Sequence, residues 1–137
     1  MRRLLPPLLL AACVPTGTPS APPEPVGPTF FDVTYPDIPP GTAALPPEPV
    51  NTPNPPLDRI IRTELALFHK GLHRNRTYYC VHPSGALEVI TTVLPTGDPK
   101  LDEIVRETVA TWTFKPATAA GKPTRACGKS EFNFRFE

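Results

Sequence analysis

Proline is the residue that most restricts what this chain can fold into. The chain has 137 residues and 22 prolines, and most of these prolines lie before residue 57. Because proline lacks a backbone N–H and fixes φ, it interrupts helices and inner strands. Residues 13–56 also contain few clustered apolar side chains to offset the entropy of ordering. We therefore expect residues 13–56 to be a disordered linker and residues 57–137 to form one small folded domain.

One apolar island interrupts the Pro-rich segment. Residues 30–36 read Phe-Phe-Asp-Val-Thr-Tyr-Pro. The island could dock onto the domain or bind a partner. The Pro-rich composition on both sides of it favours a disordered or weakly collapsed stretch instead.

The N terminus has the pattern of an export signal. Two arginines follow Met1, and a leucine-rich run then leads to Leu10-Ala11-Ala12-Cys13. The run is too short to span a bilayer. Its last four residues resemble the bacterial lipobox, in which cleavage leaves a cysteine that carries acyl chains and anchors the protein. We expect residues 1–12 to be a lipoprotein signal peptide and Cys13 to be lipidated; an ordinary export signal or a misplaced start codon is the alternative.

Two helices and three strands are predicted after residue 56. Apolar residues recur with a helical period over residues 57–72 and again over 101–112, where Asp98 can cap the second helix. Residues 76–82 and 86–93 favour a hairpin, and alternating phenylalanines favour a closing strand. The order helix-strand-strand-helix-strand predicts an α+β fold, with a three-stranded antiparallel sheet and helices on one face.

Cys80 and Cys127 form an even pair once Cys13 is set aside. Cysteines of an exported chain favour a disulfide. Cys80 lies late in the first predicted strand and Cys127 early in the last, so antiparallel pairing of these strands would bring the two together. Zinc binding by these cysteines and His82 is the alternative, but paired cysteines in an exported chain are more often oxidised.

No residue pattern supports catalysis, a metal or a cofactor. His69 and His73 are four residues apart but lack the glutamate of the metalloprotease motif. Asp102, Glu103 and Glu107 are typical of a solvated helix surface near an N terminus. The net charge is +1, and no stripe of Lys and Arg alternates with aromatic residues as in nucleic-acid-binding domains. We expect a protein that is not an enzyme, holds no metal or cofactor and binds no nucleic acid.

The last 60 residues or so resemble the C-terminal domain of TonB-family energy transducers. The landmarks are Gly-Asp-Pro at 97–99, Leu-Asp-Glu at 101–103, Trp-Thr-Phe-Lys-Pro-Ala at 112–117 and Gly-Lys-Pro at 121–123. The resemblance begins near Tyr78 and implies a small TonB C-terminal-like domain. It also implies capture of a short extended segment of an outer-membrane transporter.

The closing strand is the predicted site of that capture. It is last in the chain and expected at a sheet edge, where unpaired N–H and C=O groups can accept an extended peptide as a further strand. Its residues are Glu131, Phe132, Asn133, Phe134, Arg135 and Phe136. An edge that is simply left in water is the alternative.

These patterns together predict a lipoprotein of the cell envelope that faces the periplasm. Val14 is not the acidic residue that retains some lipoproteins in the inner membrane, which favours the outer membrane. Its TonB-like domain is expected to bind a periplasmic segment of an outer-membrane transporter or another envelope partner by strand addition. A TonB-type energy transducer for outer-membrane transport and a passive structural lipoprotein are the alternatives.

Overall fold

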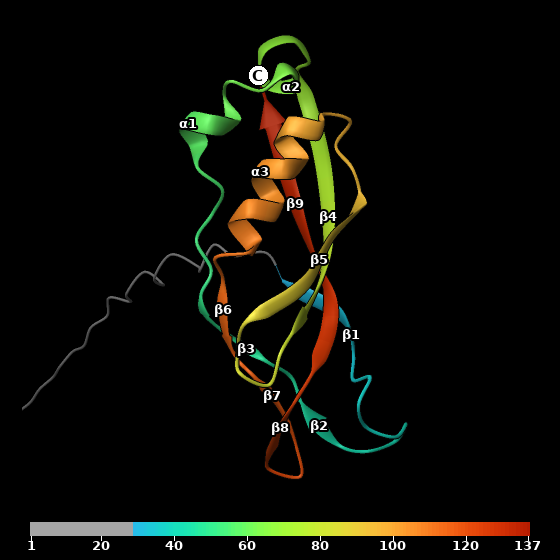
Figure 1. Ribbon diagram of the computed structural model, residues 1–137. Helices are drawn as coiled ribbons and strands as arrows, with labels where there is room; N and C mark the ends of the chain where they lie inside the picture. The colour runs from blue at the N-terminus through green and yellow to red at the C-terminus, as the bar shows by residue number, and fades with distance from the viewer. Residues whose placement is uncertain (1–28) are drawn as a thin grey trace, which may run out of the picture.

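The fold is built around a four-stranded antiparallel sheet (Figure 1). The computed structural model describes residues 29–137, so the predicted signal peptide, residues 1–12, and Cys13 lie outside the described residues. The spatial order of the strands is β1-β9-β4-β5. Their bounds are Phe30–Thr34 for β1, Gly71–Val81 for β4, Leu87–Leu94 for β5 and Ala126–Phe136 for β9.

Three helices and two smaller sheets complete the described part of the chain. The helices are α1 Leu57–Ile60, α2 Glu64–Phe68 and α3 Pro99–Val109. One small sheet joins β2 Ala44–Leu45, β7 Ala117–Ala119 and β8 Lys122–Thr124, and the other joins β3 Glu48–Asn51 with β6 Thr113–Lys115. No helix among residues 29–137 has the length and apolar character that crossing a membrane requires.

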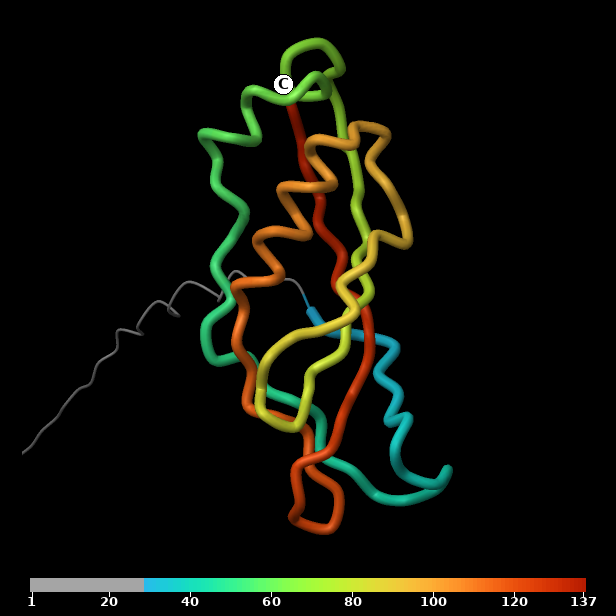
Figure 2. The backbone as a smooth tube through the Cα atoms, in the orientation of Figure 1, coloured from blue at the N-terminus to red at the C-terminus, as the bar shows by residue number. Residues whose placement is uncertain are grey.

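Strands β4 and β9 run side by side along the molecule (Figure 2). They pair without a break from Gly71 opposite Phe136 to Val81 opposite Ala126. Because side chains alternate between the two faces of a strand, apolar residues of β9 collect on the face that α3 covers. We call this side the helix face and the opposite side the open face.

The core lies between the helix face and α3. One buried cluster joins strand residues to the last part of α3 and the segment after it; its members are Tyr79, Val81, Val105, Val109, Trp112, Phe114 and Phe132. A second cluster packs α1, α2 and the first part of α3 against the C-terminal end of β9. Its buried members are Ile60, Leu65, Leu101 and Ile104. Trp112, the last apolar residue of the predicted helical stripe, and Phe114 are therefore core residues.

Asp98 begins α3 and also connects it to α2. Its carboxylate accepts from the backbone N–H groups of Lys100 (2.9 Å) and Leu101 (3.5 Å), and Pro99 occupies the first turn. These contacts confirm the predicted cap. The other carboxylate oxygen accepts from the N–H of Leu65 at 3.1 Å. One side chain thus satisfies free N–H groups at the starts of two helices.

The single helix predicted over residues 57–72 is wrong. The structure divides this stretch into α1 and α2, and Thr63 caps the second helix by accepting from the N–H of Ala66. Helix α2 ends at Phe68, since the next residue, His69, is already extended, and Gly71, with a φ of +111°, begins β4. The strand predicted to begin at residue 76 therefore begins five residues earlier.

The linker predicted over residues 13–56 is wrong for residues 30–51. These residues form β1, β2 and β3, which pair with β9, β7 and β6. The prolines did not prevent pairing because most of them lie between these short strands, while Pro49 lies in the short strand β3. The folded domain therefore includes residue 30 and does not begin at residue 57.

The predicted three-stranded sheet is corrected to four strands. Strand β1 supplies the additional strand, because the apolar island docks onto the domain rather than remaining disordered. The ring of Phe30 stacks on Tyr79 with centroids 4.9 Å apart. The guanidinium of Arg76 lies over the ring of Phe31 at 5.6 Å. The two phenylalanines of the island thus bind to opposite faces of the sheet.

Gly128 gives β1 room to approach β9. A Cβ atom at this position would lie 2.8 Å from the carbonyl oxygen of Phe31 and 2.9 Å from the ring of Phe30. Two surface ion pairs also connect this segment to β9, Asp32 with Lys129 (3.5 Å) and Asp37 with Arg125 (3.0 Å). Close packing of the backbone, rather than these exposed charges, is the stronger constraint on β1.

We expect Gly128→Ala to loosen β1 from β9. The added methyl group has no room against Phe30 and Phe31, so the free energy of unfolding should fall by about 1–3 kcal/mol. Urea unfolding measures the loss, and amide hydrogen exchange should rise in β1. Asn133→Ala, on an exposed position of the same strand, is the control and should change stability by less than about 0.5 kcal/mol. Unchanged exchange in β1 of the Gly128→Ala protein would contradict the prediction.

Candidate functional site

Strand β9 changes its surroundings halfway along its length. Over residues 127–130 it lies between β4 and β1, so the prediction that it is an edge strand is wrong for this part. The cause is the docking of β1. Over residues 131–136, β4 is its only strand partner within the described chain. We call residues 131–136 the free edge.

The positions of Cys80 and Cys127 show how the backbone of β9 is oriented. The Cα atoms of this disulfide pair are 3.9 Å apart, as expected for a close pair of opposite residues that exchange no backbone hydrogen bonds. The N–H and C=O of Cys127 therefore point away from β4. In agreement, Thr34 Oγ1 donates from β1 to the carbonyl oxygen of Cys127 at 3.5 Å.

This orientation repeats at every second residue because the register between β4 and β9 is unbroken. The backbone N–H and C=O groups of Glu131, Asn133 and Arg135 therefore point sideways from the sheet edge, away from β4. The backbone groups of the residues between them bond to β4. No strand within residues 29–137 pairs with these outward groups. The free edge thus presents backbone donors and acceptors at the spacing that an added antiparallel strand needs.

The side chains of the free edge differ between the two faces. On the helix face, Phe132 is buried while Phe134 and Phe136 are partly exposed, and neighbouring rings are 6.4 Å apart. On the open face, Glu131 is paired with Arg76 at 2.7 Å, and Asn133 and Arg135 are exposed. An added strand would therefore meet apolar rings on one face and polar groups on the other.

A buried polar network holds β4 against α3 behind the free edge. Asn75 Nδ2 donates to Asp102 Oδ1 at 2.8 Å, and Thr77 Oγ1 donates to Asn75 Oδ1 at 2.7 Å. The N–H of Thr96 also donates to the Asp102 carboxylate. The prediction of a solvated surface acid is therefore wrong for Asp102, which is buried and accepts from two donors, Asn75 Nδ2 and the N–H of Thr96. Glu107 does lie at the surface, where it pairs with Arg59 at 2.7 Å.

Tyr79 adds a second buried polar contact to the sheet. Its hydroxyl is 2.8 Å from Ser130 Oγ, at the position where β1 begins to cover β9. Burial raises the pKa of Tyr79 to about 12, although the hydrogen bond with Ser130 acts in the opposite direction. This phenol stays neutral at physiological pH, so its role is to position β4 against β9.

The outer edge of β5 is a less regular surface than the free edge. Pairing of β5 with β4 is interrupted between Arg76 and Thr77 and again between Tyr78 and Cys80. Beside the second interruption, Val89 has a φ of +59°, which is unusual for a β-branched residue. Such bulges twist an edge and break the regular spacing of its hydrogen-bonding groups. Of these two open edges, that of β9 is therefore the better template for an added strand.

The cysteine and histidine residues do not form a metal centre in the described structure. Cys80 and Cys127 form the predicted disulfide, and His82 Nδ1 accepts from the N–H of Ser84 at 3.0 Å. His73 Nε2 lies 2.9 Å from the carbonyl oxygen of His69. Across residues 29–137, no three His, Cys, Asp or Glu side chains are grouped as metal ligands.

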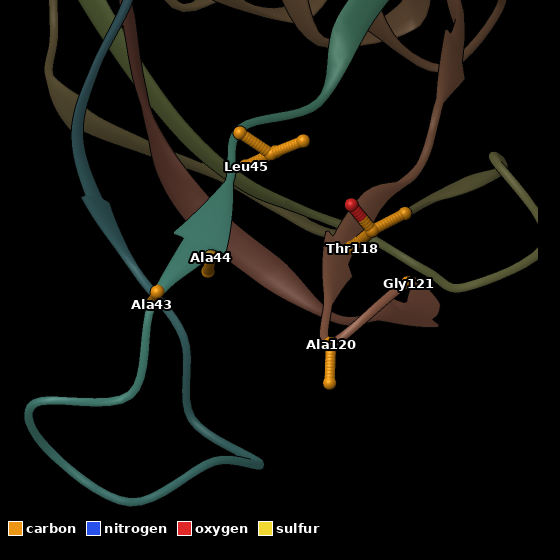
Figure 3. Close-up of a pocket in the computed structure, with 6 residues that line it drawn as sticks. All are labelled: Ala43, Ala44, Leu45, Thr118, Ala120 and Gly121. Atoms are coloured by element: carbon orange, nitrogen blue, oxygen red, sulfur yellow. The ribbon is translucent and has the colours of Figure 1, made fainter.

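A shallow recess between β2 and the β7–β8 turn is a poor candidate for a chemical site (Figure 3). Its volume is about 240 Å³. The lining residues are Ala43, Ala44, Leu45, Thr118, Ala120 and Gly121. None of these side chains titrates, and the single hydroxyl is that of Thr118. The recess therefore offers no group for acid–base or nucleophilic chemistry.

Sequence reasoning missed β1 as the element that bounds the site. The alternating residues of the island, in which Phe30 and Phe31 precede Val33 and Tyr35, are a strand signal that could have identified it. Gly128 carries no comparable signal. Its importance arises only from the approach of a second backbone.

The features above define a small α+β domain in which one strand of a helix-covered antiparallel sheet is left half open. The structure is similar to the solution NMR structure of the TonB C-terminal domain of Pseudomonas aeruginosa, with a TM-score of 0.51. The match has 20% sequence identity and covers 66% of this chain and 87% of that chain. No protein-family model and no curated protein sequence matches the chain. The chain therefore has a TonB C-terminal-like fold.

We expect removal of the disulfide to destabilise the domain without changing its fold. The bond joins residues 47 positions apart, so the Cys80→Ser and Cys127→Ser double variant should lose about 4 kcal/mol of unfolding free energy. Urea unfolding measures the difference. Wild-type protein treated with a reducing agent is the matched control and should lose a similar amount. Equal stability of the oxidised and reduced proteins would contradict the prediction.

Proposed function

We propose that this chain is a non-enzymatic protein of the cell envelope that binds an extended segment of another envelope protein by strand addition at the free edge. The observation that supports the proposal most strongly is the outward backbone of Glu131, Asn133 and Arg135. These groups lie in the frame of a regular antiparallel ladder and have no strand partner in the described part of the chain. The proposed partner is a periplasmic segment of an outer-membrane transporter or of another envelope protein.

The sheet already contains an example of the proposed interaction. Strand β1 lies on the same side of β9 and pairs with it antiparallel, although the segment is far from β9 in the sequence. Its presence supports the proposal because it shows that this side of β9 accepts a strand, with one register shift between Phe31 and Thr34. The interruptions in β5 favour the free edge of β9 over the other side of the sheet.

We further propose that acyl chains on Cys13 anchor the protein to a membrane, with the domain facing the periplasm. The absence of an acidic residue after Cys13 favours the outer membrane. Because the domain includes Phe30, the connection from Cys13 is shorter than the predicted linker.

A TonB-type energy transducer is the second candidate function. The structural similarity to a TonB C-terminal domain favours it. Energy transduction would also require a coupling to a proton-driven motor in the inner membrane, which the free edge does not supply. Both functions require the domain to bind a partner. Partner binding at the free edge should therefore be tested before coupling to a proton-driven motor.

Proline at position 133 tests strand addition directly. Asn133→Pro should remove one outward N–H of the free edge while it leaves the hydrogen bonds between β4 and β9 in place. A photo-reactive amino acid at position 137, an exposed residue directly after β9, should crosslink the partner in living cells and leaves Arg135 in place. The adduct should be lost in the Asn133→Pro protein. Electrophoresis and mass spectrometry identify the adduct.

Asn133→Ala is the matched control for that experiment. It removes the same side chain but keeps the backbone N–H, so the adduct should persist. Circular dichroism and the unfolding midpoint establish that both variants are folded. An adduct that forms equally with proline and with alanine at position 133 would contradict strand addition in the proposed frame.

The mature N terminus provides an independent test of the anchor. We expect mass spectrometry of the mature protein to find Cys13 as the first residue, with a diacylglyceryl group on its sulfur. Cys13→Ser should move the protein from the membrane fraction to the soluble fraction. A mature protein that begins elsewhere, or a Cys13→Ser protein that remains in the membrane fraction, would contradict lipid anchoring.

A further inference from the structure

The charges beside the free edge are not balanced within the described chain. Along the open face of β4 and β9, Arg76 is paired with Glu131 at 2.7 Å, and Lys129 is paired with Asp32 at 3.5 Å. Arg74 and Arg135 belong to the same face, and neither forms an ion pair with another described residue. Both are exposed. The positive charge is therefore concentrated at the C-terminal end of β9.

The nearest carboxylates do not neutralise these two arginines. Glu137 follows β9, but its side-chain carboxylate forms no ion pair with Arg74 or Arg135. Lys70 Nζ donates to its backbone carbonyl oxygen at 3.0 Å, which brings a further cation to this end of β9. Glu131 is occupied by Arg76 at the other end of the free edge. A ligand on the open face would thus meet a neutral ion pair at Glu131 and an exposed cation at Arg135.

The register assigns each position of an added strand to one face. Opposite residues of neighbouring strands share a face, so partner residues opposite Asn133 and Arg135 would lie on the open face. Partner residues opposite Phe132, Phe134 and Phe136 would lie on the helix face. There the phenylalanine rings form a continuous row, and the last two are only partly buried.

Strand β1 limits the length of the added strand. Phe30 is opposite Ser130, so a strand that extended beyond Glu131 toward Lys129 would collide with the start of β1. Gly128 and the stack of Phe30 on Tyr79 hold β1 in that position. The added strand therefore ends where β1 begins, and Phe30 sets the position of that end.

We propose that the free edge selects a short acidic strand, with apolar side chains on the helix face and a carboxylate opposite Arg135. This inference rests on the proposed function and names the chemistry of its partner. Arg135 supplies charge selection, Phe134 and Phe136 supply apolar contact, and β1 closes the site at Glu131. The partner segment is defined by the alternation of apolar and acidic side chains along it, and not by its net charge alone.

Two synthetic peptides test the proposal with the full chain. The first probe is Val-Glu-Val-Glu-Val, whose five residues fit opposite residues 132–136 without reaching Phe30, and the second replaces both glutamates by lysine; a soluble tail on each limits self-association. Because the sequences are symmetric, they place a charge opposite Arg135 in either strand direction. Titration into isotope-labelled protein, followed by NMR of the backbone amides, reports both the affinity and the position of binding.

We expect the glutamate probe to shift the amides of Glu131, Asn133 and Arg135, and to bind roughly 3- to 10-fold more tightly than the lysine probe. The amides of Cys127 and Lys129 should change little, since β1 covers them. Arg135→Glu should reverse the order of the two affinities. Arg62→Glu, a charge reversal at an exposed site outside the sheet, should leave the order unchanged.

The other outcomes separate the two levels of the proposal. If both probes shift the free-edge amides with equal affinity, charge selection is overturned and strand addition stands. Shifts that extend through Lys129 and Cys127 would overturn the role of β1 as the end of the site. If neither probe reaches the free edge, or if both bind along β5 instead, the site and the proposed function are overturned together.

Discussion

The antiparallel pairing of β4 with β9 is the interaction on which the other parts of this structure depend. Its unbroken register places Tyr79, Val81 and Phe132 on one face, where α3 packs. It places Cys80 opposite Cys127, so the disulfide reinforces the same pairing. It also decides which backbone groups of β9 point outward. A shift by one residue would move Phe132 and Phe134 to the open face and turn the outward groups inward.

Sequence patterns predicted the parts of the fold that depend on local chemistry. The cap of Asp98 and the core position of Trp112 follow from helix rules and apolar spacing. The disulfide follows from the strand positions of the two cysteines. These features are predictable because each is fixed by residues close in sequence or by one long strand pair.

The parts that were not predicted depend on contacts between distant segments. Composition indicates a disordered segment before residue 57, but the fold buries Phe30 against Tyr79 and fits β1 beside Gly128. The sequence alone indicates a surface acid at Asp102, but in the structure Asn75 and Thr96 donate hydrogen bonds to it. The candidate residues of the closing strand were identified from the sequence. The boundary of the free edge was not, because it is set by β1.

The balance of energies at the free edge indicates what kind of binding it can support. Three residues with outward backbone can form at most about six hydrogen bonds, each with a net value of about 1 kcal/mol. Association of two separate molecules costs about 4–15 kcal/mol before any contact is gained. The backbone bonds alone therefore offset this cost barely or not at all, and side-chain contacts with Phe134, Phe136 and Arg135 decide whether a strand binds. β1 avoids most of this cost because it belongs to the same chain, and its partly buried Phe30 packs against the core.

The same comparison explains why a membrane anchor would suit a site of this kind. A tether raises the local concentration of a partner in the same envelope to about the millimolar range, which makes a weak edge interaction effective. A weak edge also releases its strand readily, because affinity differences within one type of interface are mostly differences in dissociation rate. The proposed anchor and the free edge would thus be complementary: the anchor would supply the encounter, and the short open stretch of β9 would supply selectivity without permanent attachment.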